Sequence, residues 1–327
     1  MMKYVLSLAV LALGGVIAYD EFYDADKIQY HQLDFTKSPT QTGERWCVIG
    51  DGGMGNKAMD LIVESMIDLG CNQVRYLGDL VYPSGIQSVN DPLFTERFLK
   101  PITPLLEHDI PVYLLLGNHD WKGNPDAWFQ VAEKVKGVKK PYFHYAEARG
   151  DVCVFNIETT WYEKLYFAHK RMPKTDWLMD AYDAANEHCQ FSIAFGHHPL
   201  ISSGKHDDAL IQTALFLESN VFGHVDMYIA GHDHIISDEG EIDGTTQLIS
   251  GSASKVSSMS EELNPAKRFA LSAHGFLTLD FRTSDDGIWV DYTFYKVEPE
   301  SVTAPLTRVW EGSRRGTGIR NFEEMPY

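Results

Sequence analysis

Seven polar side chains that could bind metal ions occur in five short blocks of the sequence, each of which begins with glycine. Carboxylate, amide and phenol oxygens combined with imidazole nitrogens suit iron, manganese or zinc better than copper(I) or calcium. The set predicts a two-metal centre and metal-assisted hydrolysis. The candidate ligands are Asp51, Asp79, Tyr82, Asn118, His197, His232 and His234, in the blocks 50–53, 78–82, 117–120, 196–197 and 231–234.

No block is specific by itself. A Gly-Asp pair after a strand is often only a turn, because both residues tolerate the backbone angles that turns need. The Gly231-His232-Asp233-His234 block is more specific, since two imidazoles separated by one residue could bind neighbouring ions. The prediction depends on five such blocks occurring together, which turn formation alone does not explain.

Short apolar runs precede every block and read as strands that end at turns. Helical spacing of apolar residues occurs between several of them. The expected strands are 46–49, 74–77, 112–116, 191–195 and 227–230, and the expected helices are 58–69, 95–106 and 175–187.

Alternation of strands and helices predicts an α/β fold in which helices cover the sheets. Segments 247–249, 275–281 and 288–295 read as further strands without helices between them, which indicates a second, partly antiparallel sheet. We therefore expect two packed mixed β-sheets flanked by helices. Ligands of such sheets bind at the carboxyl ends of the strands, where all five blocks lie.

The first residues have the pattern of a secretory signal peptide: a basic Lys3, an uncharged and mostly apolar run, and small residues near Ala18. The alternative is a membrane anchor, but the run is shorter than the ~20 residues that a spanning helix needs. We expect a signal peptide at 1–18, an arm at 19–43, one catalytic domain at 44–300 and a tail at 301–327. The expected destination is secretion or a lysosome-like vesicle.

Composition and charge limit the partners. The chain has 327 residues, 44% of them hydrophobic, which is ample for a packed core. Its formal net charge of -18 disfavours nucleic acid, so affinity for phosphate would need local cations. We expect a monomer without stable membrane insertion.

The cysteines have no C-x-x-C spacing, so a zinc ribbon or redox pair is not expected. Cys47 and Cys153 fall in apolar runs, where free cysteine is commonly a small buried hydrophobe. One disulfide or none fits the sequence. If secretion produces a bridge, we expect it between Cys153 and Cys189.

The order of the blocks, GD-x-G, GD-x-x-Y, GNH-D, GH and GH-x-H, resembles the purple acid phosphatases among the calcineurin-like metallophosphoesterases. The small, mammalian-type tartrate-resistant acid phosphatases are the most similar group, and the resemblance spans 44–298. Most other members of the superfamily carry Asp-x-His in the first block and lack the tyrosine. Here Gly53 replaces that histidine and Tyr82 completes the second block.

This resemblance implies an acid phosphatase that hydrolyses phosphate monoesters by in-line attack of a metal-activated hydroxide, within the metallophosphoesterase β-sandwich. Fe(III) would be held by Asp51, Asp79, Tyr82 and His234. A divalent ion, Fe(II), Zn(II) or Mn(II), would share Asp79 and bind Asn118, His197 and His232. Phosphate monoesters, as small molecules or phosphoproteins, would be the substrates.

By the same resemblance, His119 and His206 would face the substrate and bind its phosphate oxygens or protonate the leaving alcohol. Asp120 would orient His119, with a plain turn residue as the alternative. His198 departs from the family, which usually has an aromatic residue there. The loop at 161–174 is rich in lysine and arginine and is either a positive rim for substrates or an ordinary solvated loop.

Two other functions fit parts of the pattern. A Zn or Mn phosphoesterase acting on phosphodiesters or nucleotides would share most of the blocks, although Tyr82 and the missing Asp-x-His argue against it. A binding protein built on an inactivated phosphatase fold would show broken ligand blocks, and none is broken.

Overall fold

The computed structural model describes residues 43–163, 176–186, 188–205, 211–261, 264–301 and 305–320. Four of the expected features lie wholly or largely outside them. These are the signal segment 1–18, residues 19–42 of the arm, residues 164–174 of the basic loop, and His206.

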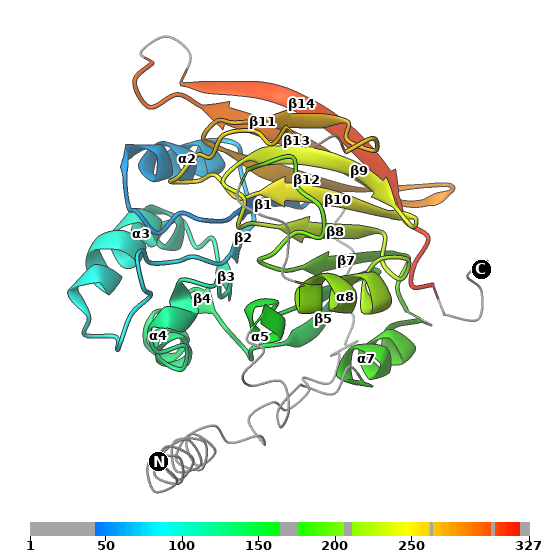
Figure 1. The fold of residues 1–327 in the computed structure, drawn as a ribbon, viewed down its shortest axis with the longest axis horizontal. Coiled ribbons are helices and arrows are strands. Elements are labelled where there is room, and N and C mark those ends of the chain that lie inside the picture. Colours follow the sequence, from blue (N-terminus) through cyan, green and yellow to red (C-terminus); the bar gives the residue numbers. More distant parts are fainter. Residues whose placement is uncertain are drawn as a thin grey trace, which may run out of the picture.

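Two seven-stranded mixed sheets pack against each other, as the sequence predicts (Figure 1). The first sheet has the order β14 (Leu306–Arg315), β13 (Gly287–Val297), β12 (Gly275–Ser284), β1 (Arg45–Ile49), β2 (Gln73–Leu77), β3 (Val112–Leu115) and β4 (Val138–Lys139). The second has the order β11 (Phe269–Leu271), β9 (Ile236–Ile242), β10 (Thr245–Ser250), β8 (Met227–Ala230), β7 (Phe191–Phe195), β6 (Val152–Asn156) and β5 (Tyr145–Arg149).

The parallel strands of each sheet lie side by side. They are β1 to β4 in the first sheet and β6, β7, β8 and β10 in the second. The remaining pairs are antiparallel. Because parallel strands point the same way, the loops that follow them meet at one edge of each sheet.

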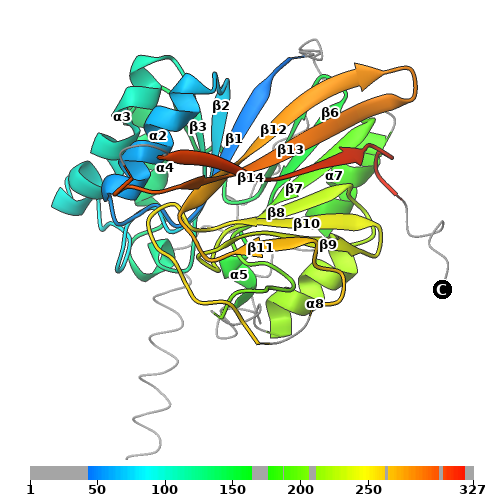
Figure 2. The same cartoon turned by 90° about the horizontal axis from the view of Figure 1, so that it is seen from above.

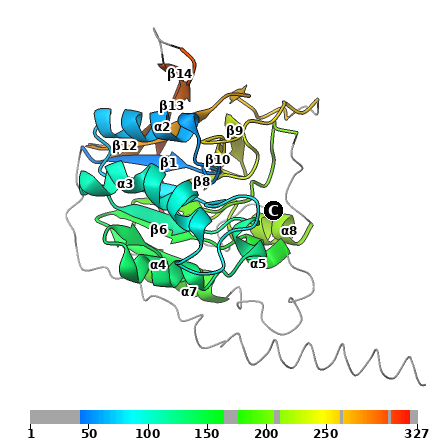
Figure 3. The ribbon, with the colours of Figure 1, turned by 90° about the vertical axis from the view of Figure 1, so that its left-hand side faces the viewer.

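Helices cover the outer faces of both sheets (Figure 2). Those on the first sheet are α2 (Lys57–Asp68), α3 (Lys100–Glu107) and α4 (Ala127–Lys134), and a helical segment at Phe94–Leu99 leads into α3. Figure 3 looks onto this side. Those on the second sheet are α5 (Thr160–Glu163), α7 (Asp176–Asn186) and α8 (Ile211–Asn220). Among the described residues, no helix has the length and apolarity to cross a membrane.

Strand β1 shows how the layers form, because successive side chains point to opposite faces. Cys47 and Ile49 pack in the cluster beneath the helices, whereas Trp46 and Val48 pack between the two sheets. Both faces of this strand are therefore buried, which explains its continuous apolar sequence.

Strand β14 lies beyond the expected domain limit at residue 300 and pairs with β13 at the edge of the first sheet. Part of the expected tail is therefore regular structure. The sequence LTRVWEGSRR carries several charges, which is typical of an edge strand.

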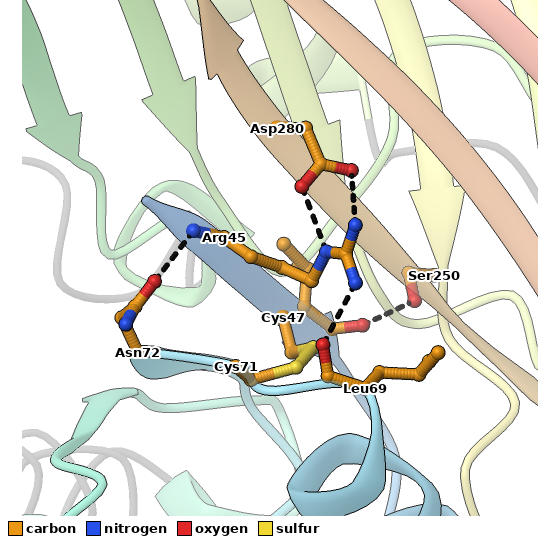
Figure 4. The surroundings of a disulfide bond; sticks show 8 residues. Arg45, Cys47, Leu69, Cys71, Asn72, Ser250 and Asp280 are labelled. Carbon is orange, nitrogen blue, oxygen red and sulfur yellow. Dashed lines mark hydrogen bonds and ion pairs between the residues drawn. A yellow bond between two sulfur atoms is a disulfide. The ribbon is translucent and has the colours of Figure 1, made fainter. Parts of the chain in front are cut away.

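Two disulfides are present, Cys47–Cys71 and Cys153–Cys189. The second was the expected pair and is confirmed, whereas the first was not expected. Each bridge joins a parallel strand to the turn before the next one, and Figure 4 shows how Cys71 lies beside the end of α2. Cys47 is buried as predicted, but its partner follows a helix whose orientation the spacing did not reveal.

Replacing both Cys47 and Cys71 by alanine should lower the free energy of unfolding by about 3–4 kcal/mol, because the bridge closes a loop with a sequence separation of 24 residues. Urea unfolding followed by circular dichroism measures the change, with the Cys153→Ala/Cys189→Ala variant as a matched comparison. An unchanged midpoint and slope in the first variant would contradict a bridge at this position.

Candidate metal centre

The five ligand blocks follow the carboxyl ends of five parallel strands drawn from both sheets. Asp51, Asp79 and Asn118 follow β1, β2 and β3 of the first sheet, while His197 and His232 follow β7 and β8 of the second. The candidate site therefore lies where the two sheets meet.

Four of the candidate ligands have a left-handed backbone conformation. Their φ angles are 60° at Asp51, 53° at Asp79, 70° at His232 and 37° at His234. Such angles are uncommon for residues other than glycine and cost free energy, and they concentrate at functional sites. The turns after these strands thus hold the side chains in positions that an ordinary helix or strand would not give.

The glycines that open the blocks let the loops approach each other closely. Gly78 has a φ of 92°, and a Cβ atom there would lie 2.6 Å from the backbone nitrogen of Gly117. A Cβ atom on Gly117 would collide with the Asp79 carboxylate. Glycine is required at both positions because the β2 and β3 loops touch.

One group of side chains gathers around the hydroxyl of Tyr82. This oxygen lies 2.9 Å from Asp51 Oδ1 and 3.0 Å from His234 Nε2. His234 Nε2 is in turn 3.4 Å from Asp51 Oδ1. Three different donor atoms therefore converge on one point.

A second group lies around His197. Its Nε2 atom is 3.7 Å from Asp79 Oδ1 and 3.2 Å from His232 Nδ1. The side-chain oxygen of Asn118 is buried without a hydrogen-bond partner among the described residues. Buried polar atoms are seldom left unpaired, so this oxygen fits a ligand to an ion.

Two imidazoles are fixed so that one ring nitrogen faces the site. His197 Nδ1 lies 2.7 Å from the carbonyl oxygen of Leu77, which can only accept, so Nδ1 carries the proton. His197 Nε2 then keeps its lone pair. His234 Nδ1 lies 3.1 Å from the Ser257 hydroxyl, which orients that ring in the same manner.

The protonation equilibria also fit bound cations. Burial raises the pKa of Asp51 to about 7, and the nearby Asp79 adds to the rise. Burial raises the pKa of the Tyr82 phenol as well, and it lowers the pKa of His234 to about 4. Burial also lowers the pKa of His197. Neutral imidazoles bind metals, and a bound cation would favour the anionic forms of Asp51 and Tyr82.

His119 lies at the entrance to the two groups. Its Nδ1 atom is 2.5 Å from the Pro83 carbonyl oxygen and its Nε2 atom is 3.9 Å from Asp79 Oδ2. The ring packs edge-on against Tyr82, with centroids 4.7 Å apart. The structure brings His119 to the site, whereas His206 lies outside the described residues.

Among the described residues, the Asp120 carboxylate forms no hydrogen bond with the His119 ring, so of the two expected roles the structure favours the turn residue over the one that orients His119. The Asp120 carboxylate accepts hydrogen bonds from the backbone N–H groups of Leu80, Val81 and Gly117. Asp120 therefore joins the β2 and β3 loops, which carry Asp79 and Asn118. The Pro83 carbonyl oxygen orients His119 instead.

Residues 52–235 match the family described as calcineurin-like phosphoesterase, and this range is more than half of the chain. The chain belongs to this family. All the candidate ligands except Asp51 lie inside the matched range, and Asp51 directly precedes it.

Curated relatives of this calcineurin-like phosphoesterase are named purple acid phosphatases and tartrate-resistant acid phosphatases. Purple acid phosphatase 3 of Arabidopsis thaliana is 28% identical over 67% of this chain, which spans 65% of that relative. Human tartrate-resistant acid phosphatase type 5 is 23% identical over 74% of this chain and 80% of its own. These relatives and the family match support the expected enzyme class, a phosphoric monoester hydrolase.

A solved structure with the same fold is that of GAP50, described as the anchor in the inner membrane complex of Plasmodium. Its TM-score is 0.66 at 20% identity, with 84% of this chain and 90% of that chain covered. At this identity the likeness concerns the fold of this phosphoesterase and not its activity.

Two supporting residues of the phosphoesterase site were not anticipated. Glu158, after β6, is fully buried and accepts hydrogen bonds from the Leu116 N–H and the Trp121 indole, 3.3 and 3.0 Å away. Lys140 Nζ lies 3.7 Å from this carboxylate. The apolar run before Glu158 resembles the other strands, but no glycine marks its end.

His198 packs behind the second group of side chains. Its ring centroid is 4.5 Å from that of His232, and its Nδ1 atom lies 2.9 Å from the Thr159 hydroxyl. Thr159 Oγ1 also accepts from the N–H groups of His197 and His198, so its own proton points to His198 Nδ1. The unusual histidine therefore supports a ligand loop of this phosphoesterase.

Proposed function

We propose that this protein is an acid phosphatase that hydrolyses phosphate monoesters at a dinuclear centre of Fe(III) and a divalent ion, Fe(II), Zn(II) or Mn(II). The observation that carries the proposal is the place of the Tyr82 hydroxyl, within 3.0 Å of both an Asp51 oxygen and a His234 nitrogen. A phenolate in such a donor set favours a hard trivalent ion.

The two groups of side chains support a division of ligands between the ions. Asp51, Tyr82 and His234 would hold the trivalent ion, and Asn118, His197 and His232 the divalent one. Asp79 would bridge them. When bound, the ions would neutralise phosphate oxygens and lower the pKa of the attacking water molecule.

His119 would act on the leaving group. Because His119 Nδ1–H donates a hydrogen bond to the Pro83 carbonyl oxygen, Nε2 is the ring nitrogen that would carry the proton for a leaving alcohol. Burial lowers the pKa of His119 below its usual 6.5, so its protonated form is populated only in acid. This supports an acidic optimum. His206 remains a proposed partner in this role.

The alternative, a Zn or Mn enzyme for phosphodiesters or nucleotides, gains no support from the position of Tyr82. A scaffold role, such as the anchoring described for GAP50, is disfavoured by the complete set of ligand blocks. The two disulfides support the proposed secretory route, because such bridges persist in oxidising compartments. A monomer with a signal peptide at 1–18 remains part of the proposal, and the catalytic domain would start at residue 44 and extend past residue 300 to include β14.

The test is the visible absorption spectrum of iron-loaded protein beside a Tyr82→Phe variant. We expect a broad phenolate-to-iron band that disappears in the variant. Tyr76→Phe is the matched control, since Tyr76 is equally buried and lies beside Gly52 but outside the ligand groups. A band that survives in Tyr82→Phe, or no band in iron-loaded wild type, would remove Tyr82 from the centre and favour the phosphodiesterase.

A further inference from the structure

Two lysines stand beside His119 at the entrance to the metal centre. Lys122 is exposed, and its Nζ atom lies 3.3 Å from both ring nitrogens of His119. Lys255 is half-buried, and its Nζ atom lies 4.4 Å from the centroid of the Tyr82 ring. Since the Tyr82 and His119 rings are themselves in contact, the four side chains form one cluster that contains two cations.

The two lysines come from separate segments of the chain. A hydrogen bond of the residue next to Lys255 holds the backbone of that segment in place. Lys122 ends the short helical turn Asp120–Lys122 after the Asn118 loop. Lys255 follows Ser254, whose hydroxyl donates to the Asp51 carbonyl oxygen at 2.6 Å. The backbone around Lys255 is thus tied to a ligand loop.

Both ammonium groups act electrostatically on the site. Each lowers the pKa of His119, in addition to the larger effect of burial, and Lys255 also lowers the pKa of His234. Within the described ranges, neither ammonium forms an ion pair with a carboxylate. The chain has a net charge of -18, so these two ammonium groups give the entrance a local positive charge that is available to an anion.

We propose that Lys122 and Lys255 bind a second anionic group, carried on the leaving group of the substrate. The preferred substrates would be phosphate monoesters of alcohols or phenols that bear a carboxylate, phosphate or similar charge. The inference rests on the proposed phosphatase function. His119 is the proposed proton donor to the leaving oxygen, so lysines beside it border the space that the leaving group occupies.

The test measures binding to the metal-loaded protein by titration calorimetry. The probes are benzylphosphonate and 4-carboxybenzylphosphonate, which are not hydrolysed and differ only in a distal carboxylate. We expect wild type to bind the carboxylated probe with an affinity about tenfold higher than that for benzylphosphonate. A charge-assisted contact between partly exposed groups is expected to raise binding affinity by about this factor. In the Lys122→Gln/Lys255→Gln variant this preference should vanish, with benzylphosphonate affinity changed less than about threefold.

Lys136→Gln is the matched control. Lys136 is almost fully exposed and pairs at 3.8 Å with Asp109, which precedes the amino end of β3, opposite the ligand loops. This variant should keep the wild-type preference. If the double variant bound both probes equally more weakly, the lysines would contact the reacting phosphoryl group instead. If the double variant kept the preference for the carboxylated probe, or if wild type showed none, the lysines would have no role in binding the carboxylate. Either result overturns the inference.

A separate assay with 4-nitrophenyl phosphate tests the proposed phosphatase function independently of the role of the two lysines. Absence of turnover by the metal-loaded wild type would contradict the proposed phosphatase. Turnover without a preference for the carboxylated phosphonate would contradict only the role of the lysines.

Discussion

Asp79→Ala should lower kcat/KM for a phosphate monoester by about three orders of magnitude, equal to several kcal/mol of transition-state stabilisation. Asp79 lies against the second ligand group, 3.7 Å from His197 Nε2, and also interacts with the Tyr82 phenol of the first. It is the carboxylate best placed to serve both ions. Metal analysis should show that the variant holds fewer than two ions per chain.

The same variant separates loss of metal from loss of fold. Asp79 and Asp51 are buried near each other, and their proximity raises the pKa of Asp51. Removing Asp79 relieves this repulsion but also removes the hydrogen bond that Asp79 Oδ1 accepts from the His119 N–H at 2.9 Å. We therefore expect the metal-free variant to stay folded and to lose no more than about 1–3 kcal/mol of unfolding free energy in urea. Asp183→Ala, on the exposed side of α7, is the control and should keep full activity. A doubly metallated, active Asp79→Ala protein would refute the proposed bridge.

Glu158→Leu should lower the free energy of unfolding by about 3–5 kcal/mol, because it leaves the buried Lys140 ammonium without its partner. Both side chains are fully buried and lie 3.7 Å apart. Burial alone raises the pKa of Glu158 and lowers that of Lys140, so each charge depends on the other. Urea unfolding at neutral pH measures the loss.

The double variant Lys140→Met/Glu158→Leu should regain most of that stability, since an apolar pair of similar size can replace a buried ion pair. Glu311→Gln, which breaks the exposed pair with Arg308, should change the free energy of unfolding by less than about 1 kcal/mol. If the double variant were no more stable than Glu158→Leu, the cost would come from the lost hydrogen bonds to Leu116 and Trp121.

The order of the strands and of the candidate ligands was predictable because each block has a local sequence pattern. An apolar run followed by glycine and a donor residue reveals both the strand and the end at which the side chain lies, as at β2 and Asp79. The gathering of the donors could then be inferred from parallel strand ends. Helix α2 was equally clear from its apolar spacing, and its Asn56 cap accepts from the Met59 N–H.

Features that depend on distant partners were not predictable. Strand β9 has the sequence ISDEGEI, whose acids argue against burial, yet Asp238 and Glu239 are fully buried. The Tyr292 hydroxyl and the Trp310 indole donate to Asp238, at 2.7 and 3.1 Å. Those donors lie on β13 and β14, and no local pattern connects them to β9. Lys255 was missed for the same reason, since only the fold places it over Tyr82.

Because the candidate ligands are divided between two sheets, the core between the sheets fixes how far apart these ligands lie. Leu77 and Phe195 end β2 and β7, immediately before the Asp79 and His197 blocks, and both side chains belong to the layer between the sheets. The thickness of this layer sets how far the two sets of loops stand apart. A change of side-chain volume there would alter the separation of the candidate ligands without touching any of them, so hydrophobic packing would influence which metal ions fit the proposed centre.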